Sequence, residues 1–188
     1  MEVYLIQHGH VDDGPCIDPT AQRLSTEGLA QAERVAGLCA EWGIQLLCAS
    51  TMRRTQEMAD AIHARLPDAL RWDLQELEDL NPDDLVGEPP PSALVSTWAE
   101  KQVRSARERA WVRVMASWAR MEVYARARGL ERVAIVAHTS TLGLLLLNWL
   151  GLDWRAMERL SLAFDGGATC RVTLSAGDQV HIDWINRV

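Results

Sequence analysis

Apolar and polar positions follow two different spacings along the chain. Short continuous apolar runs, such as Val3-Tyr4-Leu5-Ile6, are typical of strands buried on both faces of a sheet. Longer stretches place apolar residues three or four positions apart, as one buried face of a helix requires. The predicted strands are 3–6, 44–48, 70–74 and 133–136, and the predicted helices are 25–43, 50–66, 92–128 and 141–150.

Strands that alternate with helices in this way indicate an α/β fold. We therefore expect a three-layer αβα sandwich around a mostly parallel sheet. Two further apolar-polar alternations, at 168–174 and 180–185, flank a Ser-Ala-Gly-Asp turn and predict a terminal hairpin. The acidic, proline-rich stretch 76–91 is predicted to be a loop. The length of 188 residues favours a single domain over 1–188.

Large apolar residues gather on one face of the predicted helix 92–128. They are Trp111, Val114, Met115, Trp118 and Met121. Such a face usually packs into the core, and a homodimer interface is the less frequent alternative.

Composition and charge exclude several classes of partner. The formal net charge of −7 argues against nucleic acid or an anionic membrane surface as the main partner. No apolar stretch reaches the roughly 18 residues that a membrane span needs, and we expect no secretory signal. The four cysteines are scattered without a C-x-x-C pair, which favours a reducing, cytoplasmic setting.

Two histidines stand at matching places in this pattern. His8 follows the first predicted strand, and His138 follows the strand 133–136 and precedes a helix. In open α/β sheets, ligands bind beyond the carboxyl ends of the strands, so both histidines are expected to face one ligand. Gly9 lets the backbone approach closely there, and Thr139 lies at a helix start, where free N–H groups favour an anion.

An arginine pair follows another strand. Ser50-Thr51-Met52-Arg53-Arg54-Thr55 begins a helix just after the strand 44–48. A guanidinium on the first turn of such a helix is well placed to bind a phosphate through its planar fork. Either arginine alone would more often be a solvated surface residue.

Five segments, in order, resemble the histidine phosphatase superfamily with its phosphoglycerate mutase-like fold. That family begins with strand-Arg-His-Gly, followed by Leu-Thr-x-x-Gly-x-x-Gln-Ala, Ser-Ser-x-x-x-Arg-Ala, Leu-x-Glu and strand-Ser-His-Gly. The corresponding segments here are LIQHGH at 5–10, LSTEGLAQA at 24–32, ASTMRRTQEMA at 49–59, DLQELED at 73–79 and IVAHTSTLGLLLL at 135–147.

The resemblance implies a phosphatase that acts on a small phosphorylated substrate without metal or cofactor. His8 would attack phosphorus and become phosphohistidine. Glu76 would be the general acid and base, with Glu78 as the fallback. Arg54 and His138, the latter protonated, would stabilise the oxygens of the transferring phosphoryl group. Gly9 and Thr139 would contribute to phosphate binding.

The sequence departs from the family pattern at two positions. Gln7 replaces the arginine before His-Gly; it keeps a donor for phosphate but brings no charge. Thr139 stands where glycine is frequent and narrows the pocket. Arg23 and Arg53 are the candidates to supply the missing charge. Two hypotheses follow: a phosphatase of weakened activity, or a degenerate relative that binds a phosphorylated ligand without turnover.

A mutase and a metallohydrolase are the remaining alternatives. The chain has a single lysine, Lys101, and no obvious second phosphate site, which favours hydrolysis over mutase activity. His8-Gly-His10-Val-Asp12 also fits an H-x-H-x-D metal motif, whose two imidazoles could reach one zinc ion. Folds that use this motif place several strands before it or need a chain of roughly 250 residues. Here a single predicted strand precedes the motif and the chain has 188 residues, which argues against a metallohydrolase.

Overall fold

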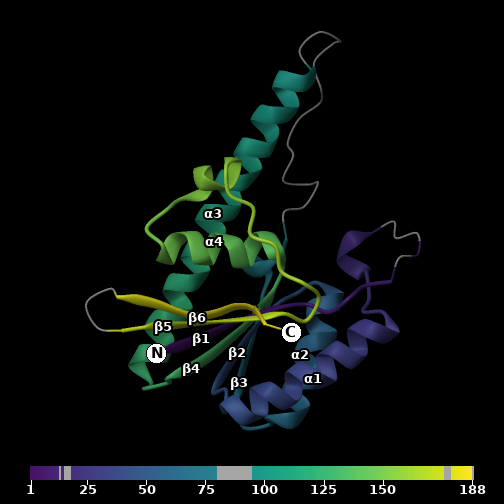
Figure 1. The fold of residues 1–188 in the computed structure, drawn as a ribbon, viewed down its shortest axis with the longest axis vertical. Coiled ribbons are helices and arrows are strands. Elements are labelled where there is room, and N and C mark those ends of the chain that lie inside the picture. The colour runs from purple at the N-terminus through teal and green to yellow at the C-terminus, as the bar shows by residue number, and fades with distance from the viewer. Residues whose placement is uncertain (13, 15–17, 80–94, 176–178, 188) are drawn as a thin grey trace.

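A six-stranded sheet forms the centre of the molecule (Figure 1). The computed structural model describes residues 1–188 except 13, 15–17, 80–94, 176–178 and 188. The strands are β1 Glu2–Gln7, β2 Leu46–Ser50, β3 Leu70–Leu74, β4 Arg132–Ala137, β5 Thr169–Leu174 and β6 Val180–Arg187. Their order is β3-β2-β4-β1-β5-β6; the first four are parallel, while β5 and β6 form the predicted antiparallel hairpin.

Helices cover both faces of this sheet (Figure 1). They are α1 Thr26–Trp42, α2 Arg53–Arg65, α3 Val95–Ala127 and α4 Thr139–Trp149, with short 3-10 helices at Pro19–Ala21 (η1), Gln75–Leu77 (η2) and Trp154–Glu158 (η4). Alternate residues of β1 enter different cores: Tyr4 and Ile6 pack with α1 and α2, and Val3 and Leu5 pack with α3 and α4. The predicted three-layer αβα sandwich is confirmed.

Local signals fixed the ends of α1. The Ser25 hydroxyl accepts a hydrogen bond from the Gly28 N–H and caps the helix. Gly43 follows the last turn with a φ of 64°, a left-handed conformation that glycine adopts without strain. The prediction for 25–43 is therefore accurate at both ends.

Other boundaries shift by a few residues. Strand β2 covers 46–50 rather than 44–48, so α2 begins at Arg53 rather than at Ser50. The reason is that Ser50 still pairs with Leu74 of β3, a contact that local sequence does not reveal. Most of the loop predicted at 76–91 lies outside the described residues.

The tryptophan-rich face of α3 packs into the core. Val114, Trp118 and Met121 are buried in the cluster beneath α4, and Trp111 and Met115 pack against its edge. The homodimer stays a prediction. In the described part of the chain, no helix is long and apolar enough to cross a membrane.

Candidate active site

The parallel strands bring the predicted site residues to one edge of the sheet. His8 follows β1 and His138 follows β4, and these two strands are neighbours. From β1 the chain turns to α1 on one face, whereas from β4 it turns to α4 on the other. This reversal is a topological switch point, the usual ligand site of an open α/β sheet. The centroids of the two imidazole rings lie 5.2 Å apart.

The protonation of His8 is set by its own turn. Its Nδ1 lies 2.8 Å from the Gly9 carbonyl oxygen, which can only accept, so Nδ1 carries the proton. The lone pair is therefore on Nε2, where the Arg54 Nε–H donates to it at 3.1 Å. Burial, reinforced by the charge of Arg54, lowers the pKa of His8 to about 4. The ring is neutral, and its unprotonated Nε2 faces Arg54.

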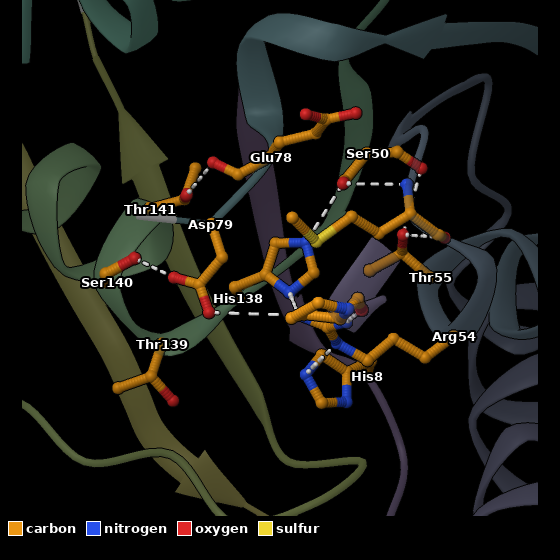
Figure 2. Close-up of polar contacts among 12 residues, drawn as sticks. His8, Ser50, Arg54, Thr55, Glu78, Asp79, His138, Thr139, Ser140 and Thr141 are labelled. Atoms are coloured by element: carbon orange, nitrogen blue, oxygen red, sulfur yellow. Dashed lines mark hydrogen bonds and ion pairs between the residues drawn. The ribbon is translucent and has the colours of Figure 1, made fainter. Parts of the chain in front are cut away.

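Arg54 joins the two histidines (Figure 2). Its side chain is almost completely buried, and its Nη2 lies 3.2 Å from Nδ1 of His138. Its Nη1 donates to the Pro19 carbonyl oxygen at 2.7 Å and holds the guanidinium plane in place. The structure thus brings Arg54 into the position that the sequence predicted for it.

His138 differs from the prediction in its charge. Its Nδ1 accepts from Arg54, so Nε2 carries the proton and donates to the Ser50 hydroxyl at 2.9 Å. Burial, together with the neighbouring His8 and Arg54, lowers the pKa of His138 well below its ordinary value. The expectation of a protonated His138 is wrong for the free protein: the ring is a neutral acceptor for Arg54.

Gly9 has a packing role in the structure. A Cβ on Gly9 would lie 2.6 Å from the carbonyl oxygen of Gly28, and a Cβ on Gly28 would lie 2.0 Å from the carbonyl oxygen of His10. The turn after β1 therefore packs directly on the backbone of the first turn of α1. The absence of a side chain on Gly9 permits this close contact, and the Gly9 carbonyl oxygen orients His8.

The acidic residues after β3 are not arranged as predicted. The Glu76 carboxylate forms an ion pair with Arg120 of α3 and does not enter the histidine cluster. The fallback Glu78 accepts from the Thr51 hydroxyl, and its side chain is turned away from both histidines in Figure 2. Asp79 takes the place at the site instead. Its carboxylate lies between the Ser140 hydroxyl and Nη2 of Arg54, which is 3.8 Å away.

A buried leucine decides which acid reaches the site. Leu77 is fully buried in the core, whereas Leu74 is only partly buried. Asp79 stands two positions after Leu77, just as Glu76 stands two positions after Leu74, so the sequence carried both forms of the Leu-x-acid pattern. Arg113 of α3 fixes the segment by donating to the carbonyl oxygens of Gln75, Glu76 and Asp79.

Comparisons with known proteins identify the family of the chain. The family model described as Histidine phosphatase superfamily (branch 1) matches residues 3–187. The chain belongs to this superfamily. No curated protein matches it significantly in sequence.

Solved structures of phosphatases share the superfamily fold. The α-ribazole phosphatase from Shigella flexneri is 20% identical, with a TM-score of 0.76 over 99% of this chain and 96% of the other. A mycobacterial glucosyl-3-phosphoglycerate phosphatase is 15% identical, with a TM-score of 0.76 over 100% and 99%. The protein histidine phosphatase SixA, solved with tungstate, is 16% identical, with a TM-score of 0.64 over 100% and 97%. At these identities the likeness concerns the fold.

Gln7, the residue before His-Gly, is a buried neutral side chain. Gln7 is buried at the end of β1, and its Oε1 accepts from the Thr139 hydroxyl at 3.3 Å. The structure thus brings Gln7 and Thr139 together beside the two superfamily histidines. They form a neutral pair.

The two arginines considered as replacements lie elsewhere. Arg23 and Arg53 both bind the carboxylate of Glu57, at 2.8 and 2.9 Å, and more than half of each side chain is exposed. Their charges are neutralised on the surface of α2. Both guanidinium groups are thus held by Glu57 in this superfamily member.

The metal hypothesis concerned His8, His10 and Asp12. Nδ1 of His10 lies 3.4 Å from the Ser25 hydroxyl at the start of α1, and His10 is exposed. Among the residues that the structure describes, no three His, Cys, Asp or Glu side chains are close enough to hold a metal ion.

Proposed function

We propose that the protein is a phosphatase that hydrolyses a small-molecule phosphomonoester through a phosphohistidine intermediate on His8. The observation that carries this proposal is the state of the His8 ring. It is neutral, its Nδ1 proton is held by Gly9, and its Nε2 lone pair faces Arg54 and His138. A nucleophile prepared in this way needs no proton removed before it attacks.

In the first step, the Nε2 lone pair of His8 forms a bond to phosphorus. The ester P–O bond breaks, and its electron pair goes to the alcohol oxygen. In the second step, water attacks phosphorus, the P–N bond breaks, and its electrons return to Nε2 with release of inorganic phosphate. Two easier displacements through phosphohistidine thus replace one difficult displacement by water.

Asp79 is the general acid and base in this proposal, in place of Glu76. It gives its proton to the leaving alcohol oxygen and later takes one from the attacking water. Its carboxylate reaches the same guanidinium that contacts both histidines, while the Ser140 hydroxyl orients it. Glu76 is paired with Arg120 and remains outside the cluster of Arg54 and the two histidines.

The charge that develops on phosphate is stabilised by Arg54, His138 and the start of α4. Arg54 exchanges its hydrogen bonds to the histidines for bonds to phosphate oxygens, which frees Nε2 of His8. His138 is the N-cap residue of α4, so the first N–H groups of that helix lie next to it. Such groups favour an anion.

Gln7 makes this phosphate site weaker. The loss of one preorganised donor typically costs about 10² to 10³ in rate, so we expect a slow enzyme. The second candidate, a binding protein without turnover, rests on the same Gln7–Thr139 pair.

We place the protein in the cytoplasm, where unpaired buried thiols such as Cys39, Cys48 and Cys170 are usual.

The decisive experiment is to trap the intermediate. Wild type and His8→Ala are mixed with ³²P-labelled phenyl phosphate, quenched in base and analysed for acid-labile protein-bound phosphate. We expect label and phenol release only from the wild type. Binding of phosphate without label and without phenol release would favour the second candidate. Equal turnover by His8→Ala would refute the mechanism.

The acid is tested by a matched pair of variants. Asp79→Asn removes a proton donor at the site and should lower kcat/KM for phenyl phosphate by about 10² to 10⁴. The loss should be smaller for 4-nitrophenyl phosphate, whose leaving group needs less protonation. Glu76→Gln, at a carboxylate that is paired with Arg120 in the wild type, serves as the control. A large loss in Glu76→Gln with none in Asp79→Asn would restore the sequence-based assignment.

A further inference from the structure

A pocket opens directly beside the proposed acid. It has a volume of about 320 Å³ and is lined at one end by Asp79, Thr139 and Ser140. From there it extends between α4, α3 and the segment that follows η4. Because a leaving group departs from the side of phosphorus where its acid stands, this pocket is where the alcohol part of a substrate would lie.

The wall away from the acid is apolar. Leu147 and Gly143 of α4 face Met157 and Leu162 across the pocket. An added Cβ on Gly143 would approach Leu162 no closer than 3.9 Å, so the glycine leaves open space. The pocket has about twice the volume of a cavity that holds one benzene molecule, roughly 150 Å³. It therefore accepts an aromatic ring with substituents.

One cation lies in this apolar lining. Arg107 of α3 reaches the pocket, and its Nε is buried without a hydrogen-bond partner among the described residues. Leaving a buried donor unpaired is unfavourable, so this site favours a ligand that supplies an acceptor. The nearby carboxylate of Glu158 in η4 does not supply this acceptor, because it pairs with Arg104, one turn before Arg107, at 3.0 Å.

We propose that the substrate is the phosphomonoester of an apolar, ring-containing alcohol that also carries a carboxylate. The ring lies against Leu147, Met157 and Leu162, and the carboxylate binds Arg107. This inference rests on the proposed function, because it assumes that phosphate is held at His8. It deepens that function by naming the chemistry of the leaving group.

Binding of phosphonates tests the pocket without requiring turnover. Methylphosphonate, benzylphosphonate and its meta- and para-carboxy derivatives are titrated calorimetrically into the wild type. The ring should tighten binding roughly tenfold or more over methylphosphonate, because it removes apolar area from water. The better-placed carboxylate should add roughly another tenfold through a charge-assisted bond.

Two pairs of variants assign these gains to residues. Arg107→Met keeps an unbranched apolar stem without the charge and should abolish only the gain from the carboxylate, while Arg107→Lys should keep part of it. Gly143→Leu fills the pocket and should abolish the gain from the ring, whereas Gly143→Ala should keep it. Methylphosphonate binding, unchanged in all four, shows that each variant is folded with its phosphate site intact.

The outcomes separate this inference from the proposed function. Equal affinity for all four phosphonates, or a carboxylate gain that survives in Arg107→Met, would refute the proposed binding of the leaving group in the pocket. That conclusion would hold even if phosphohistidine forms on His8. Absence of phosphohistidine with the expected pattern of affinities would refute the catalytic proposal and leave the pocket in place. If no phosphonate binds the wild type, both are overturned.

Discussion

Acid should destabilise this protein through His8. The ring is buried and neutral in the folded state, with a pKa of about 4, against an ordinary value of 6.5 in the unfolded chain. Between these two pH values the unfolded chain binds a proton that the folded protein does not. The stabilising contribution is therefore fully present above pH 6.5 and is lost as pH falls towards 4.

The size of the effect follows from the same two values. Between pH 7.5 and pH 5, burial of His8 should lower the free energy of unfolding by about 2 kcal/mol. His138, whose pKa is also lowered, acts in the same direction. The contribution of His8 is isolated by comparison with His8→Gln, in which the amide oxygen can still accept from Arg54 but nothing titrates.

The assay is urea unfolding at both pH values for wild type, His8→Gln and His181→Gln. His181 is an exposed histidine on β6, so its variant controls for the loss of a histidine in general. On acidification, the free energy of unfolding of His8→Gln should fall by about 2 kcal/mol less than that of the wild type. An identical loss in both would mean that folding does not lower the pKa of His8, which would contradict a ring that burial keeps neutral.

Four further substitutions test other parts of the structure. Gln7→Arg should raise kcat/KM for phenyl phosphate by about 10² and make the melting temperature more sensitive to vanadate, because it restores a charged donor; an inactive, vanadate-insensitive variant would contradict this. Gly28→Ala should lower the free energy of unfolding by about 1–3 kcal/mol, since the added Cβ would collide with the His10 carbonyl oxygen. Gly37→Ala on the same helix, where a Cβ meets nothing, should be neutral or stabilising by calorimetry. Leu77→Ala should lower the free energy of unfolding by about 2–5 kcal/mol and reduce activity, because it anchors the acidic segment; loss of stability alone would argue against that anchoring.

The sequence by itself determined the architecture and the placement of the two histidines. Continuous apolar runs and helical spacing specify strands and helices locally, and their alternation leaves a parallel sheet as the packing solution. His8 and His138 could then be placed together, because parallel strands end at the same edge. The ends of α1 were readable for the same reason, since Ser25 and Gly43 act on their own neighbours.

Only the tertiary structure decided the charges and the acid. Whether Glu76 or Asp79 reaches the site depends on which of two leucines enters the core beneath α3, and Arg113 then fixes that choice from a distant helix. His138 is neutral because burial and two neighbours from other strands and helices disfavour its proton. These properties arise from contacts between residues far apart in the chain, and the spacing of residues along a sequence carries no record of such contacts.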